Sequence, residues 1–162
     1  MATIYIGIGS NIEREVHLRA GRRSLAAAFS ALRLSAVYES AAVGFDGAPF
    51  YNLVAEAHTT QSVAEVCDTL RAIEFRHGRP QQARKFSSRT LDLDLLAYDD
   101  LCLTEPVVLP REEVLTHAFV LRPFAELNPD YRHPRLAQTL SALWQRFDAG
   151  QQPLRQVEFD WQ

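Results

Sequence analysis

The order of strand-like and helix-like segments constrains the fold of this chain more than any other feature of its sequence. Residues 3–9 alternate in the two-residue period of a half-buried strand, and residues 14–30 carry apolar side chains at helical spacing. The same reasoning predicts strands at 32–39, 51–59 and 91–98 and a helix at 63–77. A small set of packed two-layer folds accommodates this order.

Strand, helix, two strands, helix and strand form the βαββαβ pattern of a ferredoxin-like α+β fold, whose sheet is antiparallel. After residue 106 the sequence predicts short helices at 112–115, 120–127 and 136–147 and a last strand at 155–159. The chain of 162 residues has the length of one compact domain and contains no repeat or linker. We therefore expect residues 1–162 to form a single domain.

Charge and composition exclude several classes of function. The formal net charge of −3 argues against general binding to nucleic acid or to an anionic membrane, because both favour a basic surface. The sequence has no apolar run of about 18 residues, so we expect no transmembrane helix. Its start lacks the basic region of a signal peptide, and Cys67 and Cys102 have no partners in a recognisable motif. A cytoplasmic protein with free thiols follows by default.

The strand at 91–98 is strongly apolar but contains two aspartates, Asp92 and Asp94. Alternate side chains of a strand point the same way, so the two carboxylates share a face while the neighbouring leucines face the core. Two like charges there are costly unless a cation lies between them. Mg²⁺ prefers hard oxygen ligands and leaves positions for water and phosphate, which makes the pair a candidate magnesium site. The alternative is a common pair of solvated surface aspartates.

A basic stretch, residues 79–89, lies directly before these aspartates and carries Arg79, Arg84, Lys85 and Arg89. Arginine binds phosphate oxygens with a planar fork of donors, and lysine binds them as a point charge. Metal-binding carboxylates beside such a loop suit phosphoryl transfer, in which catalysis rests on positioning and charge neutralisation. Taken alone, the stretch also fits a solvated run of charges.

Aromatic side chains with a polar neighbour supply the other half of a candidate site. Phe50 and Asn52 open a strand after a loop rich in glycine and proline, and Phe119 lies in the C-terminal half. Two aromatic rings can stack on a planar heterocycle while an amide pairs with its edge, although such rings more often belong to the core.

The run Gly-x-Gly-Ser-Asn at residues 7–11 follows the first strand. It matches neither of the two common glycine-rich phosphate motifs, so tight packing in a turn is the default interpretation. Ser10 or Asn11 is expected to cap the helix that follows.

In this order the segments resemble the 6-hydroxymethyl-7,8-dihydropterin pyrophosphokinase family of folate biosynthesis, over about residues 3–147. The matching residues are Gly9-Ser10-Asn11, Phe50-x-Asn52, Glu74 with Gly78-Arg79, Arg89-Thr90-Leu91-Asp92-Leu93-Asp94 and Phe119-x-Leu121-x-Pro123. The R-x-x-D-x-D segment is the most specific of them. The resemblance implies a ferredoxin-like monomer that binds only small molecules, moves pyrophosphate from ATP to the pterin hydroxymethyl group and releases AMP.

The resemblance also implies roles on the phosphate side of a site. Asp92 and Asp94 would hold two Mg²⁺ ions that bridge the phosphates of ATP, and Arg79 and Arg89 would neutralise charge during transfer. The expected ATP-binding residues are Glu74, Arg84, Lys85, Arg89, Arg111 and His117.

On the pterin side, Phe50 and Phe119 match the pair of rings that sandwiches the heterocycle, and Asn52 matches the amide that reads its edge. Backbone groups around Ser40 and Val43 would complete this pocket.

Several positions depart from the family pattern. They are Ala41-Ala42 in place of two prolines, Gln81-Gln82 in place of a cationic pair, Phe86-Ser87-Ser88 in place of Trp-Gly-Pro, Arg111-Glu112 in place of His-Tyr, and His117 in place of an arginine. These departures leave two alternatives open. One is a paralogue that acts on a different pterin, and the other is a non-catalytic ferredoxin-like module that binds a pterin or a nucleotide.

Overall fold

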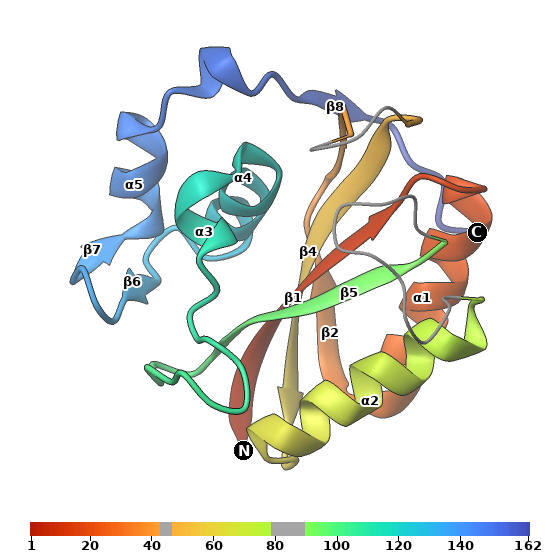
Figure 1. The fold of residues 1–162 in the computed structure, drawn as a ribbon, viewed down its shortest axis with the longest axis horizontal. Coiled ribbons are helices and arrows are strands. Elements are labelled where there is room, and N and C mark those ends of the chain that lie inside the picture. Colours follow the sequence, from red (N-terminus) through yellow and green to blue (C-terminus); the bar gives the residue numbers. More distant parts are fainter. Residues whose placement is uncertain (43–46, 79–89) are drawn as a thin grey trace.

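Antiparallel pairing joins six described strands into one sheet (Figure 1). The computed structural model of the protein describes residues 1–42, 47–78 and 90–162. The strands are β1 (Ala2–Ser10), β2 (Ser30–Leu34), β3 (Val37–Ser40), β4 (Phe50–Thr59), β5 (Asp92–Tyr98) and β8 (Arg155–Val157). Their order across the sheet is β5-β1-β4-β3-β8, and β2 pairs with the second half of β4.

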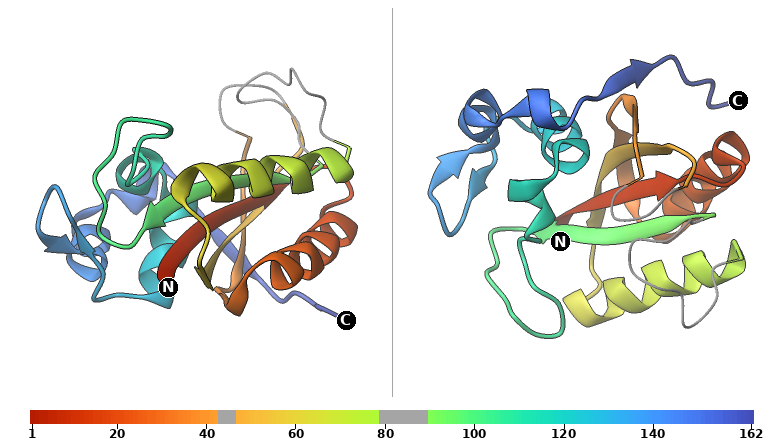
Figure 2. Two further views of the ribbon diagram at one scale, coloured as in Figure 1. Left: turned by 90° about the horizontal axis from the view of Figure 1, so that it is seen from below. Right: turned by 45° about the horizontal axis from the view of Figure 1, so that its top comes forward.

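Helices pack on both faces of this sheet (Figure 2). They are α1 (Arg14–Ala28) and α2 (Val63–Arg76) on one face, and α3 (Glu113–Thr116), α4 (Ala118–Leu127) and α5 (Leu140–Arg146) on the other. A hairpin of β6 (Arg132–His133) and β7 (Gln138–Thr139) precedes α5, and the 3₁₀ turn η1 (Ala149–Gln151) precedes β8. Within the described ranges, none of the helices combines the length and apolar character that crossing a bilayer requires.

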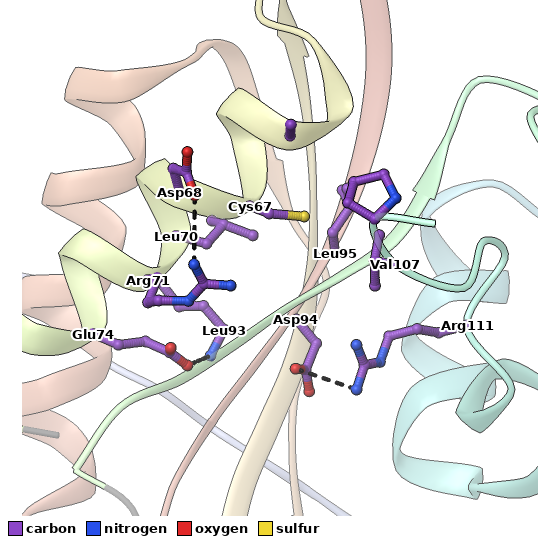
Figure 3. Close-up of a pocket in the computed structure, with 12 residues that line it drawn as sticks. Cys67, Asp68, Leu70, Arg71, Glu74, Leu93, Asp94, Leu95, Val107 and Arg111 are labelled. Atoms are coloured by element: carbon purple, nitrogen blue, oxygen red, sulfur yellow. Dashed lines mark hydrogen bonds and ion pairs between the residues drawn. The ribbon is translucent and has the colours of Figure 1, made fainter. Parts of the chain in front are cut away.

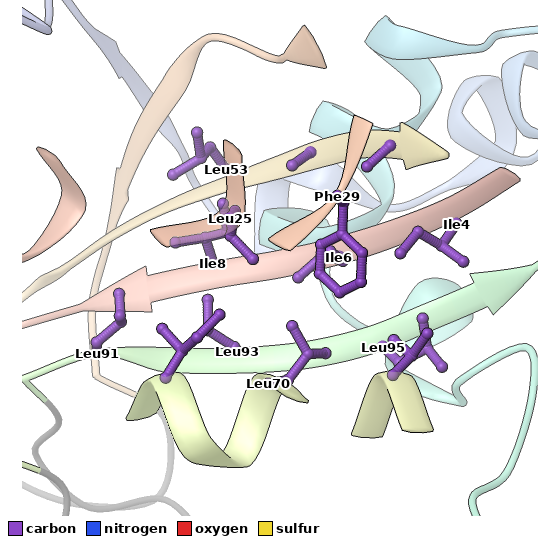
Figure 4. Packing of buried hydrophobic residues seen from close by; sticks show 14 of the residues in the cluster. Ile4, Ile6, Ile8, Leu25, Phe29, Leu53, Leu70, Leu91, Leu93 and Leu95 are labelled. Carbon is purple, nitrogen blue, oxygen red and sulfur yellow. The ribbon is translucent and has the colours of Figure 1, made fainter. Parts of the chain in front are cut away.

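Two hydrophobic clusters follow from the alternation of side chains along the strands. The first lies under α1 and α2 and includes Ile4, Ile6, Ile8, Leu25, Leu53, Leu70, Leu91, Leu93 and Leu95 (Figure 4). The second lies under α4 and α5 and includes Tyr5, Val54, Leu96, Leu121, Phe124 and Leu140. The prediction that the leucines of the aspartate strand face the core is therefore confirmed.

The predicted strand at 32–39 is two strands, because Ser35 and Ala36 leave the ladder. The Ser35 hydroxyl accepts a hydrogen bond from the backbone N–H of Val54 at 3.0 Å and donates one to the Ala36 carbonyl. The Ala36 N–H in turn donates to the carboxylate of Glu126 at 2.8 Å. The N–H of Ser35 still donates to the carbonyl of Val54, so side chains replace only part of the strand pairing at this break.

Two further local predictions were wrong. The residue before α1 is Glu13, at φ 44°, and this helix has no capping side-chain hydrogen bond, so neither Ser10 nor Asn11 caps it. The predicted helix at 136–147 starts only at Leu140, because Ala137 adopts φ 54° in the preceding hairpin. Thr139 then caps α5 by accepting from the backbone N–H of Ala142 at 3.1 Å.

Candidate active site

One predicted metal residue and one predicted pterin residue, Asp92 and Asn52, lie in one row across the sheet. Asp92 of β5 is paired with Gly9 of β1, and Gly9 is paired with Asn52 of β4. Directly paired residues of antiparallel strands point to the same face. Because neighbouring strands are about 4.8 Å apart, the backbones of Asp92 and Asn52 are separated by about 10 Å. In the next row, Asp94 is paired with Gly7.

This face of the sheet is divided between core and candidate site. Toward one end of the strands, Tyr5, Val54 and Leu96 are buried under α4. Toward the other end, the two aspartates remain half-buried. A carboxylate in this position is close to the hydrophobic core yet reachable by a ligand.

Gly9 was assigned to a turn in the sequence analysis, but the structure places it in a strand beside the candidate site. It lies inside β1, and a Cβ atom built on it would stand 2.7 Å from Oδ1 of Asn52. Real Cβ atoms do not approach that closely, so only glycine leaves the Asn52 amide where it is. A glycine within a strand pattern is the signal of such a close approach.

The structure brings Ser40, Phe50 and Asn52 together at the end of β3 and the start of β4. Ser40 pairs with Phe50 across the two strands, and Nδ2 of Asn52 donates to Oγ of Ser40 at 3.0 Å. Both polar residues are buried. A second amide, that of Asn11, donates to the carbonyl of Ala48 at 3.0 Å and ties the end of β1 to the segment before β4.

Arg111 lies beside the aspartates and is held there by Glu113 (Figure 3 shows the contact with Asp94). Its Nε donates to Oε2 of Glu113 at 2.8 Å, and Nη2 lies 3.7 Å from Oδ1 of Asp94. Its backbone N–H donates to the carbonyl of Leu96. Burial lowers the pKa of Arg111, but Asp94 and Glu113 outweigh burial and raise this pKa above its ordinary value.

Glu74 and Arg111 line one pocket of about 350 Å³ with Asp94 (Figure 3). The remaining lining residues come from α2, β5 and the segment after β5, and they are Ala64, Cys67, Asp68, Leu70, Arg71, Leu93, Leu95, Pro106 and Val107. This volume lies within the range of small-molecule sites, and the walls combine apolar residues with the charged residues Asp68, Arg71, Glu74, Asp94 and Arg111.

Glu74 is buried, and its carboxylate contacts the backbone of β5. Oε2 of Glu74 accepts a hydrogen bond from the N–H of Leu93, which lies between the two aspartates, at 2.8 Å. The helix α2 therefore fixes the strand that carries the candidate metal ligands.

We expect Glu74→Leu to lower the free energy of unfolding by about 1–3 kcal/mol, because the buried N–H of Leu93 loses its acceptor. Glu74→Gln keeps an acceptor oxygen and should restore most of that loss. Urea denaturation measures both values, with Asp68→Asn as a control at an exposed carboxylate on the same helix. Equal stability of Glu74→Leu and the wild type would contradict the assigned contact.

Phe119 and His117 lie at the start of α4. Phe119 is half-buried against the second cluster, and the ring centroids of His117 and Phe119 are 5.0 Å apart. Nδ1 of His117 is 2.8 Å from the hydroxyl of Thr116. Five predicted site residues lie outside the described residues and keep only their predicted roles: Val43, Arg79, Arg84, Lys85 and Arg89.

The carboxylates of Asp92 and Asp94 fit Mg²⁺ in chemical type and number. Within the described ranges, no group of three or more His, Cys, Asp or Glu side chains comes together that could hold a metal ion. Two carboxylates alone are the usual protein contribution to a Mg²⁺ that also binds water and phosphate.

The family model described as 7,8-dihydro-6-hydroxymethylpterin-pyrophosphokinase (HPPK) matches residues 5–129. The chain belongs to this family. A curated HPPK relative from Aquifex aeolicus is 31% identical over 137 residues, which cover 83% of this chain and 85% of the relative. One from Synechocystis is 33% identical over 147 residues, which cover 88% of this chain and 75% of the relative. The resemblance inferred from the motifs is confirmed.

Solved structures confirm the fold of this HPPK chain. The crystal structure of wild-type Plasmodium falciparum HPPK-DHPS with pteroate matches with a TM-score of 0.74 at 11% identity, covering 90% of this chain and 42% of that one. A second wild-type structure of that protein gives 0.71 at 12% identity, with coverages of 90% and 44%. The chain spans less than half of these bifunctional proteins, and at such identities the likeness supports the ferredoxin-like α+β fold alone.

Proposed function

We propose that this HPPK chain uses the row of Asp92, Gly9 and Asn52 to bring ATP and a dihydropterin together. The family reaction is the transfer of pyrophosphate from ATP to the hydroxymethyl group of 6-hydroxymethyl-7,8-dihydropterin, with release of AMP, in folate biosynthesis. The observation that carries the proposal is the position of Gly9. In the paired row, Gly9 of β1 lies between Asp92 of β5 and Asn52 of β4. The phosphates of ATP and the pterin can then lie on one face of the sheet.

On the phosphate side, Asp92 and Asp94 would hold Mg²⁺, for which two ions are expected. Bound Mg²⁺ supplies neutralisation of the phosphate charge. Arg111, held by Glu113 next to Asp94, is in reach of a phosphate chain that lies over the carboxylates. The pocket between α2 and β5 would take the nucleoside part of ATP, with its ribose and base against the apolar wall.

On the pterin side, Asn52 would pair with the edge of the heterocycle, and Phe50 and Phe119 would stack on its faces. Burial of Asn52 and its bond to Ser40 fix the amide before the substrate arrives. The pterin hydroxyl oxygen then forms a bond to the β-phosphorus, and the bond from this phosphorus to the oxygen of the α-phosphate breaks, so that AMP leaves. The hydroxyl proton leaves to solvent or to a nearby base. Arg79 and Arg89 are proposed to neutralise charge in this step.

The test is AMP formation from ATP and the dihydropterin, at increasing Mg²⁺ concentration and after removal of divalent cations with EDTA. We expect turnover to require both substrates and to fall to background with EDTA. A pterin with a longer side chain at position 6 serves as the comparison substrate. Faster turnover of that pterin would favour a paralogue, and binding of ATP and pterin without AMP would contradict the proposed reaction.

We expect Arg111→Gln to raise KM for ATP about tenfold, because a hydrogen bond between charged groups is lost. KM for the dihydropterin should change far less, since Arg111 lies on the nucleotide side. Steady-state kinetics with each substrate varied in turn measure both values. Arg146→Gln, at an exposed arginine of α5, is the matched control. An equal rise of both KM values would contradict the assignment of Arg111 to ATP.

A further inference from the structure

The C-terminal strap, defined as residues 149–157, lies beyond the segment that the HPPK family model matches. In Figure 1 it is the dark blue chain that runs from α5 across the top of the molecule to β8, and Figure 2 shows the same course. It begins with the turn η1 and ends in a strand of the sheet. Its contacts reach β3, which carries Ser40, and the start of α4, which carries Phe119.

Gln152 binds the junction between α3 and α4 with both ends of its amide. Its Oε1 accepts from the backbone N–H of Ala118 at 2.9 Å, and its Nε2 donates to the carbonyl of Thr116 at 2.9 Å. The first N–H groups of a helix have no partner within the helix. The residue before α4, His117, provides no side-chain cap, so Gln152 supplies the cap from 34 residues further along the chain.

Three residues after Gln152, the strap becomes fixed to the sheet. Arg155 pairs with Glu39 of β3 and donates to its carboxylate at 2.9 Å. Arg14 of α1 donates to the other oxygen of Glu39 at 2.7 Å. Hydrogen bonds from Arg155 and Arg14 lower the pKa of Glu39 below its ordinary value. The next residue of β3 is Ser40, which accepts from the Asn52 amide.

We infer that Gln152 is a positioning residue, which sets the first turn of α4, and with it Phe119, relative to Ser40 and Asn52. This inference rests on the proposed pterin site. Pairing of β8 with β3 fixes the position of the strap. The hydrogen bonds of the Gln152 amide then hold the α3–α4 junction to the strap. The rest of α4 is held by buried residues such as Leu121 and Phe124. Loss of the Gln152 bonds should therefore loosen the turn that carries Phe119 without unfolding the helix.

The test uses Gln152→Met, which removes both hydrogen bonds at similar side-chain length. Gln151→Met, at the exposed neighbouring residue, is the matched control. We expect KM for the dihydropterin to rise about fivefold, the equivalent of one ordinary hydrogen bond. We expect kcat and KM for ATP to stay within about a factor of two, because the phosphate side is untouched. Hydrogen exchange of the Ala118 amide should be faster in Gln152→Met than in the control.

Gln152→Glu keeps an acceptor for the Ala118 N–H and loses the donor to Thr116. We expect slower exchange at Ala118 than in Gln152→Met, together with an intermediate KM for the dihydropterin. An unchanged KM for the pterin in Gln152→Met, beside an active wild type, overturns the inference. An equal change of both KM values or of kcat alone also overturns it, because it would indicate a purely structural role. A wild-type protein that does not turn over the dihydropterin overturns the proposed function itself.

Discussion

Asp94→Asn is expected to lower kcat for AMP formation by roughly 10³-fold, which corresponds to about 4 kcal/mol of transition-state stabilisation. Asparagine has the size of aspartate and keeps an oxygen atom beside Arg111, so the fold should remain. What changes is the charge that holds the cation. The Mg²⁺ concentration at half-maximal rate should rise as well, and kinetics at increasing Mg²⁺ measure both effects. The thermal unfolding temperature, measured alongside, should stay close to that of the wild type.

The matched control is Asp100→Asn, at an exposed aspartate just beyond the same strand. It should leave kcat and the Mg²⁺ dependence unchanged. Asp92→Asn should resemble Asp94→Asn, and the double variant should be little worse than either single variant, because the two carboxylates act on the same ions. Full activity of Asp94→Asn would contradict the proposed metal site.

Gly9→Ala is expected to raise KM for the dihydropterin by about tenfold or more. The added methyl group would force the Asn52 amide to move, and the pterin edge would then lose its hydrogen-bond partner. The new methyl group would also lie 3.6 Å from Cδ1 of Phe50, which is an ordinary contact. Affinity for ATP, measured by calorimetry, should change little. The stability of the fold should fall modestly, since the moving group is the end of a side chain and not the backbone.

Gly7→Ala is the matched control, because Gly7 lies on the same strand and face. The nearest atom to its built Cβ is Cδ2 of Leu96 at 3.4 Å, an ordinary van der Waals distance. Gly7→Ala should therefore keep KM for the dihydropterin near that of the wild type. If Gly9→Ala and Gly7→Ala have the same KM for the dihydropterin, the close approach of Gly9 to Asn52 does not fix the position of the Asn52 amide.

The strands and long helices could be predicted because their apolar periods are local properties of the sequence. The alternation of Ile4, Ile6 and Ile8 was sufficient to predict β1 and its buried face, and both predicted long helices were found. The break between β2 and β3 could not be predicted. It depends on Val54 and Glu126, which are distant in the chain from Ser35 and Ala36.

In the candidate site, too, local features could be predicted and contacts between distant residues could not. Asp92 and Asp94 were identified from one strand, but the row that joins Asp92 to Asn52 requires the register of three strands, which a single sequence does not fix. The support of Arg111 by Glu113 and the bonds from Gln152 depend on tertiary geometry. The single domain, the monomeric state and the roles of the residues at 79–89 stay predictions.

The bond between Glu74 and Leu93 also bears on association between copies of the chain. Among the described strands, β5 is the last on its side of the sheet. An edge strand generally offers N–H and C=O groups to any other extended chain. The buried carboxyl group of Glu74 occupies one of these donors. An incoming strand would have to displace that carboxyl group before it could pair with this N–H. The contact that ties α2 to the aspartate strand thus also removes one backbone donor from those that this edge could offer to another strand.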